Sequence, residues 1–251
     1  MAGHSHWAGI KHKKALIDAK RGKLWSKLSK AIIVAARMGG GDPDQNNRLR
    51  LAIDAAKAVS MPKDNIQRAV KRGAGELEGT TYEDVLYEGY GSGGVAILCE
   101  VLTDNRNRTA SELRKVFEIS DGKLGGAGCV AWMFDKKGLF LIAADKVDED
   151  KLMEIALEAG ADDVSPSGDK FEVTCTPEVF TAVADALAAA GIEPEAREVA
   201  RIPKNTVDVN DADVARKILK LMERLDDHDD VQSVSSNFNI PDAIMAQVEA
   251  P

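Results

Sequence analysis

Apolar residues in the stretch 23–38 recur every three or four positions, as at Leu24, Leu28 and Ile32. This spacing places them on one face of an α-helix. Glycines at 39–41 follow directly, and glycine readily adopts the left-handed conformation that ends a helix. The pattern therefore predicts one amphipathic helix that stops at the glycines.

Two further amphipathic helices are indicated over 45–59 and 62–72. Apolar residues recur at helical spacing in both stretches, and basic residues occupy many of the other positions. Pro62 opens the second stretch, and proline is favoured in the first turn of a helix. Together with the first helix, they predict a small basic bundle.

Residues 138–202 contain a different alternation. Short stretches typical of strands alternate with helical periodicity in the order strand, helix, strand, strand, helix, strand. This order is the split βαβ unit of ferredoxin-like folds. The six elements are expected at 139–143, 148–159, 162–166, 170–175, 177–190 and 196–202.

The segments on either side of this unit contain strands and helices of their own. The simplest architecture joins the two segments into one α/β domain, which the ferredoxin-like unit interrupts. The elements of this domain are expected at 85–90, 95–102, 109–119, 129–134, 211–225 and 231–238.

The predicted fold class is α+β and multidomain: a basic N-terminal helical bundle followed by two ferredoxin-like α/β domains, one inserted in the other. A polar, glycine-punctuated connector at 75–81 indicates the first boundary. The predicted domains are a helical domain with an N-terminal arm over 1–78, a discontinuous domain over 79–135 plus 205–251, and an inserted domain over 136–204.

Charge is strongly segregated along the chain. The first 73 residues contain 16 Lys or Arg against 5 Asp and no Glu, whereas the remainder contains 17 against 36. The overall net charge of −8 hides this division. A surface of one sign repels itself unless a partner neutralises it. The basic end therefore indicates nucleic acid, and its binding is expected to be strongly salt-dependent.

The candidate contacts lie on the first helix and on the arm before it. The lysines at 23, 27 and 30 form a second stripe on that helix, suited to phosphate. The arm adds side chains that contact phosphate or stack on bases. The candidate residues in this region are Trp7, Lys11, His12, Lys13, Lys14, Lys20, Arg21, Lys23, Lys27 and Lys30.

A second contact is predicted at the start of the helix over 109–119. Arg106 and Arg108 stand where the free N–H groups of a helix N-terminus also attract phosphate. Capping of the helix by Asp104 or Asn105 accounts for this polar cluster equally well.

The basic bundle also allows interpretations without nucleic acid. Its cations could form an ordinary solvated surface, or they could grip an acidic protein as part of a scaffold. Membrane headgroups are a weaker candidate because the apolar stripes are narrow and are needed for packing between the helices.

Signals for catalysis are weak. The glycines of 89–94 match the dinucleotide-binding spacing, but a strand follows them, which favours a hairpin turn. Cys99, Cys129 and Cys175 lie in or beside apolar strands and are expected to be buried thiols. No catalytic residue, metal site or cofactor is predicted.

The cysteines form no pairing pattern and no signal peptide or membrane span is recognisable, so a cytoplasmic protein is expected.

The run of acidic residues around His228 supports one enzymatic alternative. Asp226, Asp227, Asp229 and Asp230 could hold a divalent cation, as in a metal-dependent nuclease or phosphatase. The run lacks the spaced ligands of a calcium loop.

Several motifs together resemble the YebC/PmpR family, which includes the mitochondrial translational activator of cytochrome c oxidase. The similarity extends over essentially the whole chain. The matching segments read AGHSHWAGIKHKK, DAKRGKLWSKLSKAI, AARMGGGDPDQNNRLRLAI, MPKDNIQRAVKRGAG, YEGYGSGG and TDNRNRTASELRKVF.

The resemblance implies a non-enzymatic, cytoplasmic, three-domain protein that acts as a DNA-binding transcriptional regulator or as a ribosome-associated translation factor. The expected partner is therefore DNA or ribosomal RNA, including the ribosome itself. The predicted stripe is rich in Lys and poor in the side chains that read base edges, which favours structured RNA. The sequence leaves the oligomeric state and the regulated genes undetermined.

Overall fold

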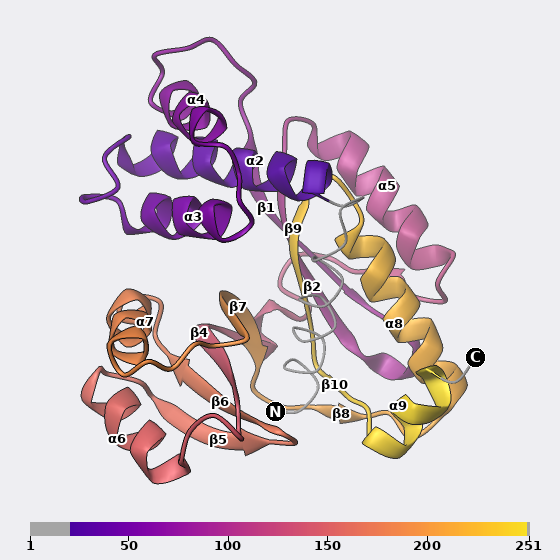
Figure 1. The fold of residues 1–251 in the computed structure, drawn as a ribbon. Coiled ribbons are helices and arrows are strands. Elements are labelled where there is room, and N and C mark those ends of the chain that lie inside the picture. Colours follow the sequence, from indigo (N-terminus) through magenta and orange to yellow (C-terminus); the bar gives the residue numbers. More distant parts are fainter. Residues whose placement is uncertain (1–20, 250–251) are drawn as a thin grey trace.

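The computed structural model describes residues 21–249, and the side chains of Arg21, Asp242 and Glu249 also lie outside the description. The described chain begins with three helices that pack against one another (Figure 1). Their bounds are α2 Arg21–Gly39, α3 Asn47–Ala58 and α4 Lys63–Gly73, within two residues of the predicted limits.

The bundle forms because the apolar stripes of its three helices meet. Ile32 of α2, Leu49 of α3 and Ile66 of α4 belong to one buried cluster. Gly40, with φ of 87°, follows α2 in the left-handed conformation. The buried amide of Asn46 accepts a hydrogen bond from the N–H of Leu49 and so caps α3. These signals are local, which explains why the sequence predicts the helices well.

A four-stranded antiparallel sheet with the order β3-β1-β2-β9 forms the next layer. Helices α5 and α8 pack on one face of this sheet through a shared apolar core (Figure 1). The strands are β1 Glu83–Tyr90, β2 Ala96–Thr103, β3 Lys123–Leu124 and β9 Val231–Ser236, and the helices are α5 Arg106–Glu118 and α8 Ala212–Asp226.

The second sheet has the order β5-β6-β4-β7, and α6 and α7 contribute to its core. Its elements follow one another as strand, helix, strand, strand, helix, strand, which is the order that the sequence pattern predicts. They are β4 Phe134–Ala143, α6 Glu149–Glu158, β5 Asp163–Ser167, β6 Lys170–Cys175, α7 Phe180–Ala189 and β7 Ala196–Pro203.

The first sheet differs from the expectation of two ferredoxin-like units. Its central strands β1 and β2 are consecutive and form a hairpin, so the chain order is not the split βαβ order. The connection is a short turn containing η2 Ser92–Gly94, in which Gly93 and Gly94 have positive φ. The glycine-rich segment is thus a hairpin turn and not a dinucleotide-binding loop.

The strand predicted over 129–134 is wrong. Residues Ala131–Met133 form the 3₁₀ helix η3, and the strand β4 starts only at Phe134. The carboxylate of Glu88 accepts hydrogen bonds from the N–H groups of Gly128, Val130 and Ala131, and these bonds take the place of a strand ladder. Consequently β4 runs across the domain boundary predicted at 135.

Three short elements near the end of the chain are not predicted by the sequence pattern. Strands β8 Val207–Asp208 and β10 Phe238–Asn239 pair in parallel, and helix α9 Asp242–Glu249 packs against α8. Elements of two residues carry no measurable periodicity, so their pairing is evident only in the folded chain. Among residues 21–249, none of the helices has the length and apolarity needed to span a membrane.

Candidate functional site

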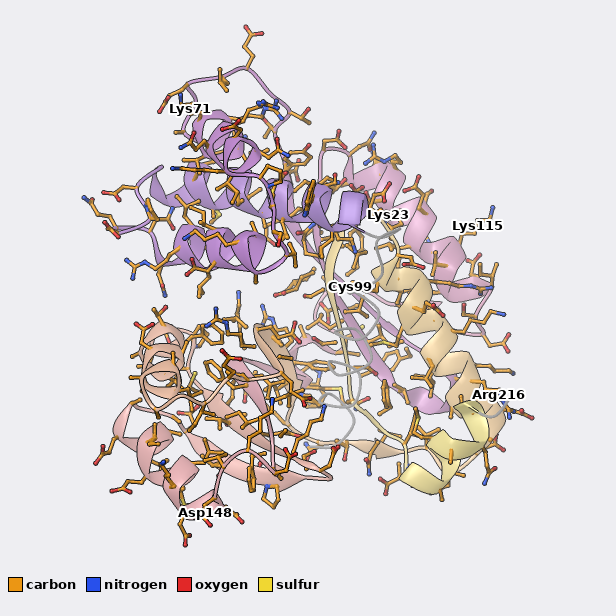
Figure 2. The ribbon with its side chains drawn as sticks, in the orientation of Figure 1. Lys23, Lys71, Cys99, Lys115, Asp148 and Arg216 are labelled. Atoms are coloured by element: carbon orange, nitrogen blue, oxygen red, sulfur yellow. The ribbon has the colours of Figure 1, made fainter. Side chains whose placement is uncertain are left out.

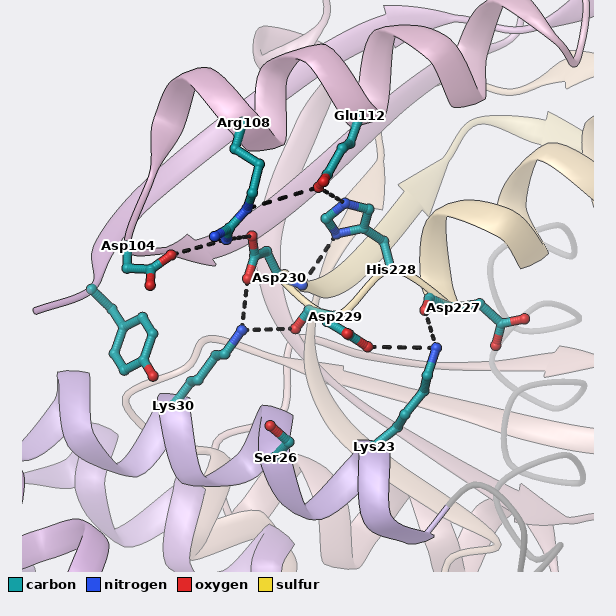
Figure 3. A pocket seen from close by; sticks show the side chains of 11 residues that line it. Lys23, Ser26, Lys30, Asp104, Arg108, Glu112, Asp227, His228, Asp229 and Asp230 are labelled. Atoms are coloured by element: carbon teal, nitrogen blue, oxygen red, sulfur yellow. Dashed lines mark hydrogen bonds and ion pairs between the residues drawn. The ribbon is translucent and has the colours of Figure 1, made fainter. Parts of the chain in front are cut away.

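Two lysines of α2 bind the acidic loop, residues 226–230, at the end of α8. Lys23 Nζ donates to the carbonyl oxygen of Asp227 at 3.0 Å and lies 3.5 Å from the carboxylate of Asp229 (Figure 3). Lys27 Nζ donates to the carbonyl oxygen of Asp226. The carbonyl oxygens that end a helix carry partial negative charge, so cations are stabilised there.

Lys30 forms the most buried of these contacts. Its Nζ lies 2.7 Å from Asp230 Oδ1 and donates to the carbonyl oxygen of Asp229 at 3.1 Å. Only 13% of the Lys30 side chain and 5% of the Asp230 side chain are exposed. Tyr82 adds its ring 5.5 Å from the same ammonium group. The largely buried ion pair between Lys30 and Asp230 therefore holds the bundle against the α/β region.

Asp230 is the centre of a larger polar network (Figure 3). Its second carboxylate oxygen accepts hydrogen bonds from Arg108 at 2.7 Å, Thr109 at 2.8 Å and Thr103 at 3.2 Å. Burial alone would raise the pKa of this carboxyl group, but the hydrogen bonds from Lys30, Arg108 and Thr109 outweigh it and hold the pKa well below its usual range.

The arginines predicted as a second contact have partners of their own. Asn105 caps α5 by accepting from the N–H of Arg108 at 3.1 Å, so the capping interpretation holds. The guanidinium of Arg108 bridges Asp104 and Asp230. Arg106 is 62% exposed and lies 3.6 Å from a carboxylate oxygen of Glu83.

A cleft of about 560 Å³ lies between α2, the start of α5 and the acidic loop (Figure 3). Its lining mixes both signs of charge: Lys23, Lys30, Arg108, Asp104, Glu112, Asp227, Asp229 and Asp230, with Ser26, Tyr82 and His228. Most of these charges are already paired with one another across the cleft.

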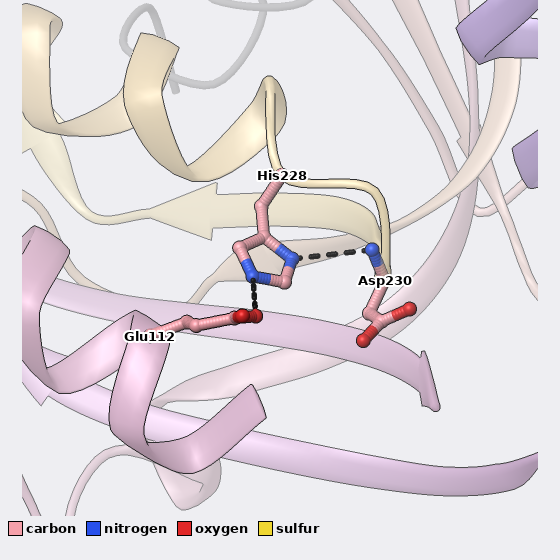
Figure 4. A group of neighbouring side chains, drawn as sticks. All are labelled: Glu112, His228 and Asp230. Carbon is pink, nitrogen blue, oxygen red and sulfur yellow. Dashed lines mark hydrogen bonds and ion pairs between the residues drawn. The ribbon is translucent and has the colours of Figure 1, made fainter. Parts of the chain in front are cut away.

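Glu112, His228 and Asp230 bring three possible metal-ligand atoms within 4.8 Å of one another (Figure 4). His228 Nδ1 accepts a hydrogen bond from the backbone N–H of Asp230 at 3.1 Å. His228 Nε2 is therefore the nitrogen that donates to Glu112, at 2.9 Å. Both ring nitrogens and the Asp230 carboxylate are occupied, and two cations lie beside that carboxylate. This donor set does not fit a divalent metal ion.

The structure changes the interpretation of the predicted contacts. Lys23, Lys27 and Lys30, the predicted phosphate contacts on α2, donate to the acidic loop. The reason is tertiary: the loop stands about 200 residues away in the chain and supplies the opposite charge. The contact of these lysines with phosphate stays a prediction. The candidates Trp7, Lys11, His12, Lys13, Lys14 and Lys20 lie outside the described residues, as does the side chain of Arg21.

Helix α4 presents the exposed basic surface that sequence reasoning did not select. Lys63, Arg68, Lys71 and Arg72 are all exposed, and their side chains form no ion pair or hydrogen bond within residues 21–249. Figure 2 shows Lys71 on the side of the bundle away from the α/β layers. The signal was present in the sequence, because Arg68, Lys71 and Arg72 fall opposite Ile66 and its apolar neighbours on the helical wheel.

Two family descriptions match the chain. The TACO1/YebC protein N-terminal domain matches residues 5–76, and the TACO1/YebC second and third domain matches residues 82–238. This protein belongs to the TACO1/YebC family. The resemblance seen in the sequence motifs is thereby confirmed.

Relatives of this TACO1/YebC protein align with it over nearly their full length. A "Probable transcriptional regulatory protein" of Rhodopirellula baltica is 58% identical over 96% of this chain and 98% of its own. One of Syntrophobacter fumaroxidans with the same description is 55% identical over 99% of this chain and 100% of its own. The crystal structure of a conserved hypothetical protein from Aquifex aeolicus shares 49% identity, with a TM-score of 0.83 over 94% of this chain and 97% of that one.

Proposed function

We propose that this protein is a non-enzymatic regulator of gene expression that binds DNA or ribosomal RNA through its basic N-terminal region. The names of its relatives support a role in regulation. The observation that carries the proposal is the group of exposed cations on α4, whose four basic side chains have no protein partner in residues 21–249.

Helix α4 is suited to a phosphate backbone. The helix carries four exposed cations, three of them on the side opposite Ile66, against one acidic residue, Asp64. Phosphate contacts of this kind position a protein on nucleic acid without reading its sequence. If all four cations contact phosphate, log K is expected to fall with log salt at a slope of about −3.6 on duplex DNA.

The lysines of α2 orient this surface. Because they bind the acidic loop, α4 lies on the outer side of the bundle and faces away from the α/β layers (Figure 1). The acidic residues of those layers would repel phosphate, so this orientation favours contact through α4. The arm residues Trp7, Lys11, His12, Lys13, Lys14 and Lys20, together with Arg21, remain part of the proposed surface.

The test compares two charge reversals of equal size. Arg68→Glu with Lys71→Glu removes cations from α4, whereas Arg114→Glu with Lys115→Glu alters exposed cations of α5. Fluorescence anisotropy with a DNA duplex and with a folded ribosomal RNA fragment is measured across a salt series. We expect the α4 variant to lose at least about tenfold in affinity and to have a salt slope shallower by about 2, because each phosphate contact contributes about 1.

Equal losses in both variants would show a non-specific charge effect and would contradict the proposal. Unchanged binding by the α4 variant would contradict the assignment to α4. Ultraviolet crosslinking in cells, with sequencing of DNA and of RNA, then distinguishes the partners: promoter fragments without ribosomal RNA decide for DNA, and ribosomal RNA decides for translation. Recovery of an acidic protein alone would support the scaffold alternative.

The enzymatic alternative has a separate test. A nuclease or phosphatase centred on His228 requires turnover with Mg²⁺ that Asp227→Asn with Asp230→Asn abolishes while nucleic-acid binding survives. We expect no turnover, because the atoms of the Glu112, His228 and Asp230 group are engaged in hydrogen bonds with the protein.

A further inference from the structure

An exposed aromatic patch lies on the first sheet, remote in sequence from the basic bundle. Trp132 of η3 is 66% exposed and Tyr90 at the end of β1 is 39% exposed. Both side chains donate a hydrogen bond to the carbonyl oxygen of Cys129, Tyr90 at 3.1 Å and Trp132 at 3.3 Å. One oxygen atom therefore holds two aromatic side chains close together at the surface.

The loop that carries Trp132 is held rigidly. Glu88 is only 4% exposed, and its carboxylate accepts hydrogen bonds from the N–H groups of Gly128 at 2.5 Å, Val130 at 2.7 Å and Ala131 at 2.7 Å. A carboxylate buried at this depth is stable only when such donors surround it. The exposed ring therefore stands on an ordered backbone, and little conformational freedom is lost when a ligand binds it.

The surroundings of the rings combine positive charge with open space. Lys123 of β3 stands directly opposite Tyr90 in the sheet register, so the two side chains share a face. Lys123 is exposed, and it forms no ion pair within residues 21–249. Gly126 and Gly128 are exposed, with no atom near the position that a Cβ would take, so a ligand can approach the backbone closely.

The size of the patch identifies the class of ligand. A tryptophan side chain buries at most about 250 Å² in a contact. A stable protein partner would cover roughly 800 Å². Two exposed rings, with a lysine opposite the tyrosine in the sheet, instead match a short stretch of nucleotides, with a base on the indole ring and a phosphate on the ammonium group.

We propose that Trp132, flanked by Tyr90 and Lys123, stacks an unpaired base of a single-stranded nucleic acid. The inference rests on the proposed function, since it concerns the same class of partner, but it assigns a second contact surface in the α/β region. A strand that reaches both α4 and Trp132 is held at two points, and only the second of them requires an exposed base.

The experiment combines one change in the protein with one change in the ligand and compares the four resulting affinities. Affinities of the full-length protein and of Trp132→Ala are measured by anisotropy for a short single-stranded RNA and for the same strand with abasic sites, which keeps the phosphates and removes the bases. We expect Trp132→Ala to weaken binding of the intact strand by about 5- to 150-fold and Trp132→Phe to retain most of the affinity. The abasic strand should bind both proteins equally.

Further measurements distinguish a loss of base stacking from a general loss of folding or of nucleic-acid binding. Trp132 is exposed, so Trp132→Ala should keep the thermal midpoint of the parent protein, and its binding to duplex DNA should be unchanged. Quenching of tryptophan fluorescence by the intact strand should be present in the parent protein and diminished in Trp132→Phe, because phenylalanine stacks without the indole emission.

The outcomes separate the two proposals. If duplex and single strand bind but Trp132→Ala weakens neither, the inference is wrong and the proposed function stands. If the parent protein binds no nucleic acid at all, both are wrong. If Trp132→Ala leaves the single-strand affinity intact but abolishes self-association in sedimentation, the patch is a contact between copies of the chain, and the stacking site is overturned.

Discussion

Lys30 of α2 and Asp230 of the acidic loop stand 200 residues apart in the chain, yet their charged atoms lie 2.7 Å apart and both side chains are largely buried. This pair joins the helical bundle to the first sheet. It also gives the ammonium group of Lys30 acceptors within the protein, whereas the cations of α4 have none within residues 21–249.

Removing Lys30 should destabilise the protein. Lys30→Ala leaves Asp230 buried with one partner fewer, and breaking a buried ion pair costs about 3–5 kcal/mol. Because Arg108 and two threonines still bind Asp230, we expect the lower part of this range in urea unfolding. Lys57→Ala serves as the control: its pair with Asp54 is exposed, so the change should be below about 1 kcal/mol.

A stability loss no larger than that of Lys57→Ala would show that the contact between bundle and sheet does not depend on this pair. Double-mutant cycles with Asp230→Asn measure the coupling directly, since they cancel the effect of each residue on the rest of the fold.

Stability should fall in acid. The folded protein lowers the pKa of Asp230 and of Glu88, in both cases because hydrogen bonds outweigh the effect of burial. A lowered pKa in the folded state stabilises the protein above the unfolded pKa, which is near 4 for these groups, and the stabilisation is lost as pH falls towards the folded pKa. Urea midpoints measured from pH 6 to pH 3 should therefore fall below about pH 4, and Asp230→Asn should flatten this decline.

A side chain at Gly73 should destabilise the protein. A Cβ atom there would lie 2.4 Å from the carbonyl oxygen of Ile33 and 2.7 Å from the Cβ of Ala36, so α4 would have to move away from α2. Gly73→Ala should lower stability by about 1–3 kcal/mol and weaken nucleic-acid binding through α4. Gly22→Ala is the matched control, because a Cβ at Gly22 meets no atom within 4 Å and alanine favours the helix. Equal thermal midpoints for the two variants would contradict this packing.

The thiols should react slowly in the folded protein. Burial raises the pKa of Cys99 to about 12 and that of Cys175 to about 11, and the thiolate is the reactive form. At pH 8, a thiol reagent should label Cys129 before the other two, since only Cys129 is partly exposed. Mass spectrometry of partially labelled protein identifies the order, and early labelling of Cys99 would contradict the buried core of β2.

Local signals in the sequence determined the helices and much of the strand order. The apolar stripes of α2, α3 and α4 and the glycines after α2 act within a few residues, so periodicity and capping predict them. The order of strands and helices along the chain from β4 to β7 is predicted in the same way, because the periodicity of each element is local. Glu88 shows the limit of this reasoning: its carboxylate binds the N–H groups of Val130 and Ala131, 42 and 43 residues away, and the segment predicted as a strand over 129–134 contains the 3₁₀ helix η3.

Charge segregation was also visible in the sequence, but the free cations were not. The stripe of Lys23, Lys27 and Lys30 and the stripe on α4 are equally basic when each helix is considered alone. Only the folded chain places the acidic loop against α2 and leaves α4 exposed. The physical reason is that the electrostatic potential around a lysine is dominated by the charges within a few ångströms of it. Tertiary packing brings those charges from the far end of the chain.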